Sequence, residues 1–332
     1  MLSTRKEPEN LKAQDLWIFK HELQRNFAEP SIVKLRNTFI TADGHFTDKY
    51  KSNPAISYHA KFFSLRLYRL FQKIRQLKCA VIFQKHLIIT DEWSKSYFHW
   101  LMDCLPRLIL FESRRPEIPV ILPSYLREKS FVIESLALLG KNNFRFLEED
   151  KWYFLRTVYF PVHLAPTGNY NDEATRKLRS AITVNSNAPA HLKIYISRHK
   201  AAHRKIDNED ELLPLLKKNG FKTVYCEEMS FKDQVSLFSE TAVLLTNHGA
   251  GLTNMLFMPA NSIIIELRKK NDNHNNCYFS LASALNLKYY YQQCEAVNKD
   301  EDAYTASVIV EQDQLQQLIR EVTEGKKQET NF

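Results

Sequence analysis

The chain has 332 residues, of which 44% are hydrophobic and 25% are charged, a composition typical of globular proteins and unlike that of disordered ones. Its 46 basic and 38 acidic residues give a net charge of +8. That excess fits an anionic partner such as nucleic acid, lipid or a phosphorylated substrate, and it equally fits a solvated basic surface. No stretch approaches the ~18 uncharged apolar residues of a membrane-spanning helix.

The cysteines and the N-terminus bear on the cellular compartment. Five scattered cysteines, never spaced as Cys-x-x-Cys, argue against a disulfide framework and against a zinc site. Residues 1–10 are polar and lack the apolar core of a signal peptide. We therefore expect a protein of the reducing cytoplasm.

The N-terminal region is expected to be largely irregular. Residues 1–50 show no regular periodicity, and Asp43-Gly44 is a predicted turn. Residues 61–78 then place apolar side chains at helical spacing, with basic side chains between them. Such a basic amphipathic helix either lies on an anionic membrane, at its inner face, or packs by one side on its own domain.

The rest of the chain alternates short apolar runs with amphipathic segments. The predicted strands are residues 80–83, 86–90, 118–122, 157–160, 193–197, 223–225, 242–246, 262–267 and 288–291. The predicted helices are residues 96–113, 127–139, 209–218, 230–240, 276–286 and 312–322. The cleaner alternation of the second half predicts a parallel sheet with helices on both faces, and such sheets bind ligands outside the carboxyl ends of their strands.

The proline-rich and glycine-containing stretch at residues 161–170 is typical of a connection between domains. We therefore expect an α/β chain with one domain at residues 1–168 and a second at residues 169–310. Residues 311–332 would form a C-terminal helix and tail.

A glycine turn is the strongest local signal. Two of the seven glycines of the chain lie within His248-Gly249-Ala250-Gly251, at the carboxyl end of the predicted strand 242–246. Residues 252–258 are predicted to begin a helix that ends at Pro259. A strand, a glycine turn and a helix start present free backbone N–H groups and the positive end of a helix dipole, which suit a phosphate or diphosphate.

A second loop should share the same edge of the sheet. Residues 197–208 leave the carboxyl end of another predicted strand and are rich in basic side chains. Arg198 and Lys205 suit a diphosphate, because arginine donates paired hydrogen bonds to phosphate oxygens. Asn208 is either a ligand contact or the N-cap of the following helix. No pair of carboxylates typical of a metal site accompanies these elements, so we expect no metal ion.

The predicted helix 96–113 places His99, Asp103 and Arg107 on one face at i, i+4 spacing. An imidazole beside a carboxylate is an arrangement for general-base catalysis, and we expect His99 or Asp103 to be the base. The same spacing equally allows a buried ion pair between Asp103 and Arg107, with His99 hydrogen-bonded in the core. Pro106 should bend this helix.

Several of these blocks together resemble the sequence pattern of glycosyltransferase family 61. They are His248 to Pro259 followed by Ile263 to Glu266, Tyr97 to Asp103 with Leu105-Pro106-Arg107, Ser197-Arg198 with Arg204-Lys205-Ile206 and Asn208, and Phe231 to Gln234. The resemblance implies a GT-B architecture, in which two Rossmann-like domains face one another across a cleft. It also implies inverting transfer of a sugar from a nucleotide-diphosphate sugar, with a UDP-sugar as the expected donor.

The residues expected to bind the donor and its diphosphate are Arg198, Lys205, Asn208, His248, Gly249, Ala250, Gly251, Leu252, Thr253, Asn254 and Glu266. No cofactor is expected besides the donor substrate. Because the chain shows neither the signal nor the anchor of the eukaryotic members, we expect a bacterial-type polysaccharide enzyme with a glycan or lipid-linked glycan as acceptor. We expect no nucleic-acid partner, because no binding motif is present.

Two further interpretations stay open. A protein that binds nucleotide sugars or anionic glycans without catalysis would carry the same anion-binding turn. A polysaccharide pyruvyltransferase of GT-B-like architecture would share the fold but use a different donor.

Overall fold

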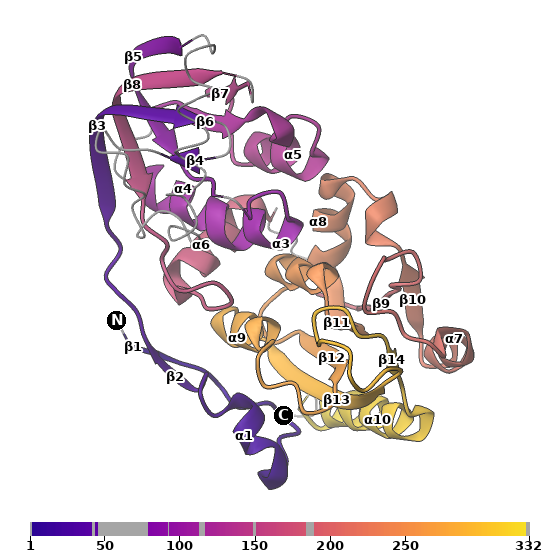
Figure 1. Cartoon of the computed structure of the whole chain (residues 1–332). Coiled ribbons are helices and arrows are strands. Elements are labelled where there is room, and N and C mark those ends of the chain that lie inside the picture. Colours follow the sequence, from indigo (N-terminus) through magenta and orange to yellow (C-terminus); the bar gives the residue numbers. More distant parts are fainter. Residues whose placement is uncertain are drawn as a thin grey trace. The chain divides into compact units, whose positions relative to one another are not determined.

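The computed structural model describes residues 2–41, 44–45, 79–91, 93–112, 117–148, 151–183 and 189–329 (Figure 1). The chain divides into two compact units. Unit 1 consists of Met1 and residues 27–167 and 173–182, and unit 2 consists of residues 2–26, 168–172 and 183–332. The N-terminal segment thus belongs to the same unit as the C-terminal half of the chain.

Unit 1 is built on a mixed sheet. Its strand order is β4 (Gly44–His45), β3 (Ile32–Thr41), β8 (Trp152–Pro161), β5 (Cys79–Ile88), β6 (Val120–Pro123) and β7 (Phe144–Leu147). Strands β8, β5, β6 and β7 are parallel, whereas β3 runs antiparallel to β8 and β4. The order of the parallel strands reverses between β5 and β8, which makes their carboxyl ends the topological switch point of this sheet.

The helices of unit 1 include one unusual segment. They are α3 (Tyr97–His99), η3 (Trp100–Cys104), α4 (Leu105–Glu112), η4 (Ser124–Leu126), α5 (Ser130–Leu138) and most of α6 (Asp172–Ile182). The first three form one continuous helix, and η3 is a π-helical turn directly before Pro106. The proline ring would clash with the preceding turn of a regular α-helix, and π turns widen a helix locally. The bend expected at Pro106 therefore takes the form of a π turn.

Unit 2 contains a doubly wound sheet. Its strand order is β10 (Phe221–Val224), β9 (Leu192–Ile196), β11 (Thr241–Asn247), β12 (Ile263–Lys269), β13 (Lys288–Ala296) and β14 (Val308–Ile309). All neighbours are parallel except β13 and β14. In chain order the parallel strands stand 2-1-3-4-5, so the switch point lies between β9 and β11. The prediction of an α/β chain with parallel sheets is confirmed.

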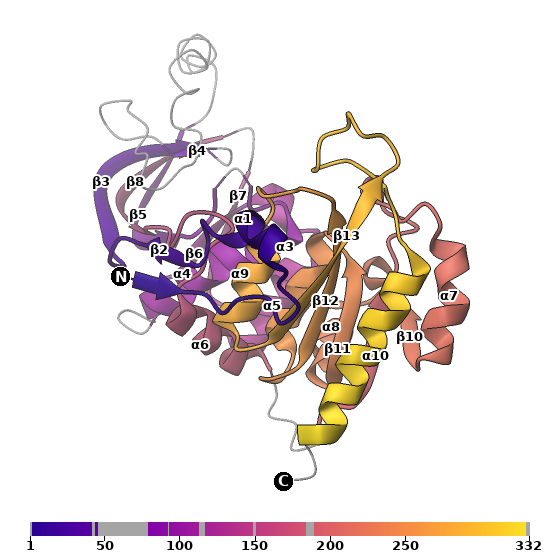
Figure 2. The ribbon, with the colours of Figure 1, turned by 90° about the horizontal axis from the view of Figure 1, so that it is seen from below.

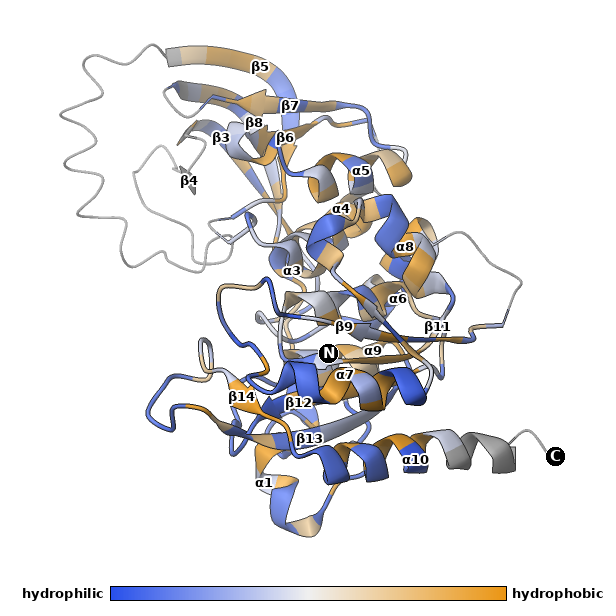
Figure 3. Cartoon of the chain, turned by 90° about the vertical axis from the view of Figure 1, so that its right-hand side faces the viewer, coloured by the Kyte–Doolittle hydropathy of each residue, from blue (hydrophilic) through white to orange (hydrophobic). Residues whose placement is uncertain are grey.

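Helices pack on this sheet as the alternation predicts. They are α7 (Glu209–Lys218), η5 (Cys226–Glu228), α8 (Phe231–Ser239), η6 (Ala250–Phe257), α9 (Cys277–Ala284) and α10 (Gln312–Glu329). Figure 2 shows α7 and α10 along the same side of the sheet, and their apolar side chains share one core with β9, β11 and β12. Helix α10 carries hydrophilic and hydrophobic residues on different sides (Figure 3), as expected for a helix that covers a sheet.

The N-terminal segment forms an outer layer of unit 2 rather than the irregular region that was expected. It contains β1 (Leu2–Thr4), η1 (Ala13–Asp15), α1 (Leu16–Phe19) and β2 (Gln24–Asn26). The Phe19 ring lies 4.9 Å from that of Phe279 in α9 and 5.0 Å from that of Tyr291 in β13. The prediction was wrong because this segment is ordered by contacts with residues more than 250 positions away, and not by a local pattern.

Other differences from the predicted elements are local. Strand β3 lies within the supposedly irregular region, and β7 and α6 were also missed. Asn37, in the middle of β3, has a positive φ of 51°, and the weak alternation around it hid this strand. The strands predicted at residues 80–83 and 86–90 are one strand, β5, with an irregular register between Ile82 and Lys85. The helix predicted at residues 61–78 and Asp43 of the predicted turn lie outside the described residues.

Among the helices in the described ranges, none combines the length and the apolar character that crossing a membrane would require.

Candidate functional site

Two loops meet at the switch point of unit 2, as the sequence predicts. One follows β9 and begins at Ser197, and the other follows β11 and contains the glycine turn. The Thr246 hydroxyl donates to the Ile196 carbonyl at 2.7 Å, and the Asn247 amide donates to the Arg204 carbonyl at 2.9 Å. The prediction that these loops share one edge of the sheet is therefore confirmed.

Arg198 bonds to backbone carbonyls of the first loop, and its side chain leaves room only for a glycine at residue 249 of the second loop. Its Nε donates to the Arg204 carbonyl and its Nη2 to the His203 carbonyl, both at 2.9 Å. A Cβ added at Gly249 would lie only 2.1 Å from Nη1 of Arg198. Gly249 has extended backbone, with φ 164°, so the arginine and not the backbone conformation requires a glycine here. Burial, and then the charge of Arg204, lower the pKa of Arg198.

Arg204 brings a second guanidinium to the same place. Its backbone has a positive φ of 55°, which turns the loop back toward β9. Its Nε is buried and has no hydrogen-bond partner. Within the described part of the chain, neither Arg204 nor Arg198 forms an ion pair with a carboxylate. We call these two residues the arginine pair.

The arginine pair suggests an anion, because two neighbouring guanidiniums that are partly shielded from water repel one another unless a counter-charge joins them. Sequence reasoning named Arg204 only as part of a motif and did not assign it a ligand. The signal was present in the sequence, since two arginines stand in one short loop at a strand's carboxyl end.

A buried network positions His248. Glu266 accepts a hydrogen bond at Oε1 from Nδ1 of His248, and at Oε2 from the Tyr289 hydroxyl at 2.6 Å. The Glu266 side chain is fully buried, whereas that of His248 is 9% exposed. Burial, and then the charge of Glu266, raise the pKa of Tyr289. The Glu266 carboxylate is thus enclosed in the protein and bonded to both His248 and Tyr289.

The segment after the glycine turn is helical, but it is a 3₁₀ helix, η6, rather than an α-helix. Leu252, Thr253 and Asn254 are all fully buried. The Asn254 amide donates to Oε1 of Gln234 at 3.0 Å, which links η6 to α8. Gly251 lies against β9, since an added Cβ would be 3.3 Å from Ile196. These side chains are therefore packed within unit 2.

Lys205 and Asn208 differ in their surroundings. Lys205 is exposed, and its backbone N–H donates to the Ser307 hydroxyl at 3.2 Å. Asn208 occupies the N-cap position of α7 but makes no capping hydrogen bond with its side chain. Instead its amide donates to the Val310 carbonyl at 2.9 Å, and its Oδ1 accepts from the Val310 N–H at 3.0 Å. Asn208 thus ties the loop to the chain just before α10.

Unit 1 carries the His99–Asp103 pair. Nδ1 of His99 lies 2.7 Å from Oδ2 of Asp103, and the two side chains are 20% and 5% exposed. The His99 ring also packs against the Trp93 ring, with centroids 5.0 Å apart. The buried carboxylate and the partly exposed imidazole form an arrangement in which Asp103 orients the ring and His99 presents its other nitrogen.

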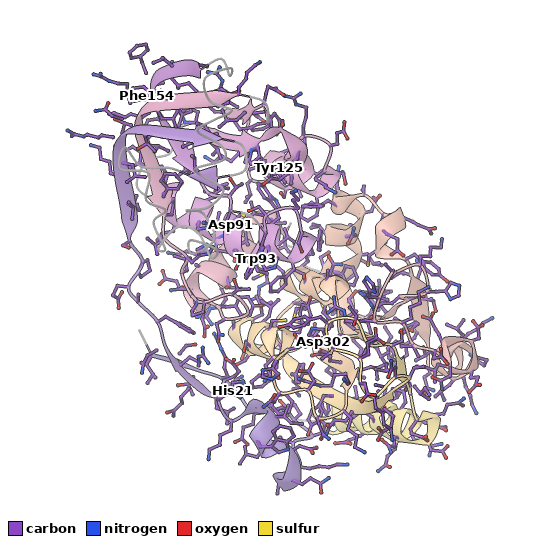
Figure 4. All side chains as sticks on the ribbon, viewed as in Figure 1. His21, Asp91, Trp93, Tyr125, Phe154 and Asp302 are labelled. Atoms are coloured by element: carbon purple, nitrogen blue, oxygen red, sulfur yellow. The ribbon has the colours of Figure 1, made fainter. Side chains whose placement is uncertain are left out.

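Arg107 does not pair with the Asp103 carboxylate. Its Nη2 donates to Oδ2 of Asp91 at 2.8 Å, and its Nε donates to the backbone carbonyl of Asp103 at 2.9 Å. The alternative of a buried Asp103–Arg107 ion pair is thus replaced by an Asp91–Arg107 pair. Asp91 follows β5 and lies beside Trp93 (Figure 4), whose backbone N–H donates to Oδ1 at 2.9 Å.

His163, which follows β8, lies 3.3 Å from the same oxygen of Asp91. Burial raises the pKa of Asp91, but the hydrogen bond with His163 and the charge of Arg107 outweigh burial and hold that pKa well below its usual value. Sequence reasoning missed Asp91 and His163. Each comes within three residues after a strand at the switch point of unit 1, and that position was the available signal.

No group of three or more histidine, cysteine, aspartate or glutamate side chains is arranged to hold a metal ion in the ranges that the structure describes.

The fold and these contacts define an α/β protein with a doubly wound sheet and a cationic cluster at its switch point. The family model of glycosyltransferase 61 matches residues 97–265, which is 169 of the 332 residues and includes His99, Asp103 and the arginine pair. The chain belongs to the glycosyltransferase 61 family, which confirms the resemblance found in the sequence.

Several curated proteins are similar to part of the chain. The "EGF domain-specific O-linked N-acetylglucosamine transferase" of Drosophila melanogaster is 38% identical over 98 residues, 29% of this chain and 18% of that protein. The protein of that name in Mus musculus is 32% identical over 108 residues, 30% of this chain and 19% of that protein. The "Protein O-linked-mannose beta-1,4-N-acetylglucosaminyltransferase 2" of Xenopus laevis is 34% identical over 115 residues, 33% of this chain and 20% of that protein. The matches thus span about a fifth of each relative.

Proposed function

We propose that this protein is an inverting, metal-independent glycosyltransferase of GT-B architecture that uses a UDP-sugar as donor and a glycan or lipid-linked glycan as acceptor. In this proposal, unit 2 binds the nucleotide sugar and unit 1 supplies the base across a cleft. The family membership supports the reaction class.

The observation that carries the proposal is the arginine pair. Two neighbouring guanidiniums, one with a buried Nε that has no partner, lie at the switch point of a 2-1-3-4-5 sheet. Sheets of this order bind phosphate-containing ligands at that point. A diphosphate would supply the missing acceptors and counter-charge, and it gathers further negative charge as it leaves the sugar. Arg198 and Arg204 would stabilise that charge in the transition state.

The remaining donor contacts are proposed in two groups. His248, held by Glu266, would donate from its second ring nitrogen or its backbone N–H. The backbone of Gly249 to Asn254 would approach the diphosphate at the start of η6, whose side chains are largely packed inward. Lys205 and Asn208 stay proposed contacts, but their surroundings favour the arginine pair as the main anion site.

The proposed chemistry is a single displacement. An acceptor hydroxyl attacks the anomeric carbon from the face opposite the diphosphate, and the new carbon–oxygen bond forms as the bond to the diphosphate breaks. Asp103 holds the hydrogen on Nδ1 of His99, so Nε2 of His99 is free to accept the hydroxyl proton. The electron pair of the broken bond leaves with UDP. Burial of Asp103 favours His99 as the base and Asp103 as its orienting partner.

Binding and transfer can be tested in one series. A UDP concentration of 100 times its dissociation constant should raise the free energy of unfolding by about 2.7 kcal/mol. Calorimetry with UDP, and then release of UDP from a panel of UDP-sugars with oligosaccharide acceptors, would measure both functions. Failure of UDP and of other nucleoside diphosphates to stabilise the protein would contradict the donor site. Tight UDP binding without transfer to any acceptor would favour the non-catalytic alternative.

A further inference from the structure

Asp103 stands between two competing hydrogen-bond donors. His99 lies four residues before it and Arg107 four residues after it on one helix, and both spacings bring side chains into contact. The guanidinium of Arg107 is already at the Asp103 residue, because its Nε donates to the Asp103 backbone carbonyl at 2.9 Å. The i, i+4 spacing also allows this guanidinium to reach the Asp103 carboxylate. An arginine–carboxylate pair is a strong one, so its absence requires a cause.

Asp91 provides the cause. It accepts from Nη2 of Arg107 at 2.8 Å, and both side chains are almost fully buried, at 0% and 2% exposure. Its carboxylate is held in place by the Trp93 N–H at 2.9 Å and by the Ser94 hydroxyl at 3.1 Å. Asp91 is therefore a fixed, ionised acceptor that holds Arg107 and leaves the Asp103 carboxylate for His99.

We propose that Asp91 is a positioning residue for glycosyl transfer, which keeps Asp103 paired with His99 by capturing the guanidinium of Arg107. This inference rests on the proposed role of His99 and Asp103 as base and orienting partner. It assigns a function to a residue outside the sequence motif, one that touches neither His99 nor the Asp103 carboxylate.

The proposal predicts an exchange of partners in Asp91→Asn. The substitution keeps the shape of the side chain but removes the charge that pairs with the buried guanidinium of Arg107. The Asp103 carboxylate stands four residues before Arg107 on the same helix, and Arg107 is already bonded to the backbone carbonyl of that residue. Arg107 then pairs with Asp103, and His99 loses the hydrogen bond that fixes its tautomer.

Nitrogen-15 NMR of the full chain, labelled at histidine, measures this exchange directly. The hydrogen-bonded Nδ1–H signal of His99 is assigned by its loss in His99→Gln. We expect this signal to disappear in Asp91→Asn. We expect kcat to fall by at least about 100-fold. The donor KM and the UDP dissociation constant should stay within about threefold, because the proposed function assigns donor binding to unit 2 and Asp91 belongs to unit 1.

A double variant tests the cause. In Asp91→Asn/Arg107→Met the competing cation is absent, so the His99 signal should return and kcat should recover to within about tenfold of wild type. Glu148→Gln is the matched control. It breaks the exposed Arg127–Glu148 pair of unit 1, which spans 2.8 Å, and should change neither the signal nor kcat.

Each outcome decides the question. If Asp91→Asn lowers the melting temperature but leaves the His99 signal and kcat per folded molecule intact, Asp91 is only structural and the proposal is overturned. If Asp91→Asn does not fold, the double variant decides, since loss of both the signal and kcat in a folded double variant also overturns it. Loss of the signal without loss of kcat would overturn the base assignment and the positioning role together, while UDP affinity would still report on the donor site.

Discussion

The two switch points of this protein carry charged clusters of opposite character. At the edge of the unit 1 sheet the charges satisfy one another, with Asp91 bound to Arg107 and Asp103 bound to His99. At the edge of the unit 2 sheet, Arg198 and Arg204 lie together with no carboxylate partner in the described residues. The same kind of sheet edge thus holds a network of paired charges in unit 1, which we call the closed network. In unit 2 it holds two arginines without a carboxylate partner in the described residues, which we call the open network.

The difference indicates where a ligand supplies the missing charge. A buried ion pair fixes the side chains that take part, and removing one member leaves an uncompensated charge. Two neighbouring guanidiniums repel one another and are tolerated where an anion joins them. The closed network is therefore suited to orient a base, and the open one is suited to bind a diphosphate.

Asp103→Asn should have the largest effect on turnover. Asparagine keeps the shape of the side chain but removes the charge that stabilises protonated His99, so kcat should fall by about 10²–10⁴-fold. UDP affinity should be preserved, because the substitution lies in the closed network. Turnover, UDP affinity and melting temperature are to be measured on the same preparation. A less stable enzyme with near-normal turnover per folded molecule would contradict a catalytic role.

Removing one member of the arginine pair should weaken UDP binding. Arg204→Met removes a charge-assisted hydrogen bond of about 1.5–3 kcal/mol, which corresponds to a loss of affinity of about 10- to 150-fold. Arg198→Ala should act in the same range. Lys205→Ala removes an exposed charge from the same loop, and its smaller contribution should keep the loss of affinity within about threefold. Equal losses for Lys205 and Arg204 would refute the arginine pair as the main anion site.

The two glycines of the turn should respond differently to alanine. In Gly249→Ala the new Cβ would lie 2.1 Å from Nη1 and 2.6 Å from Cζ of Arg198, so the guanidinium must move. We expect UDP affinity to fall by about tenfold, as for a weakened charged hydrogen bond. In Gly251→Ala the Cβ would lie 3.3 Å from Ile196, which should lower the free energy of unfolding by about 1 kcal/mol and leave UDP affinity unchanged. If Gly251→Ala instead lowered UDP affinity more than Gly249→Ala, the ligand would not lie beside Arg198.

Chelation should have the smallest effect. If the arginine pair neutralises the diphosphate, activity after treatment with EDTA should stay within about twofold of the untreated enzyme, since no metal is needed for charge stabilisation. The same assay repeated with added Mn²⁺ or Mg²⁺ completes the test. A complete loss of activity that either ion restores would show that a metal assists the leaving group.

Local patterns predicted most of unit 2. Strand β11 is buried at every position, and its residues 242–245 form an apolar run, as in central parallel strands. The shared edge of the two loops also followed from the sequence, because parallel strands end on the same side. Strand β3 and residues 2–26 were not predictable in this way. They are stabilised by β8 and by the α9 and β13 region, and those contacts leave no period in the local sequence.

The candidate site was also predictable only in part. The amino-acid sequence was enough to identify the family, the glycine turn, and the helix face that carries His99, Asp103 and Arg107. It left open which neighbour binds the Asp103 carboxylate, because i, i+4 spacing places a donor on either side of it. Only the tertiary structure decided this, by bringing Asp91, 16 positions earlier, to the guanidinium of Arg107. Helical spacing defines which side chains can meet, and the long-range approach of a fixed charge selects which of them do.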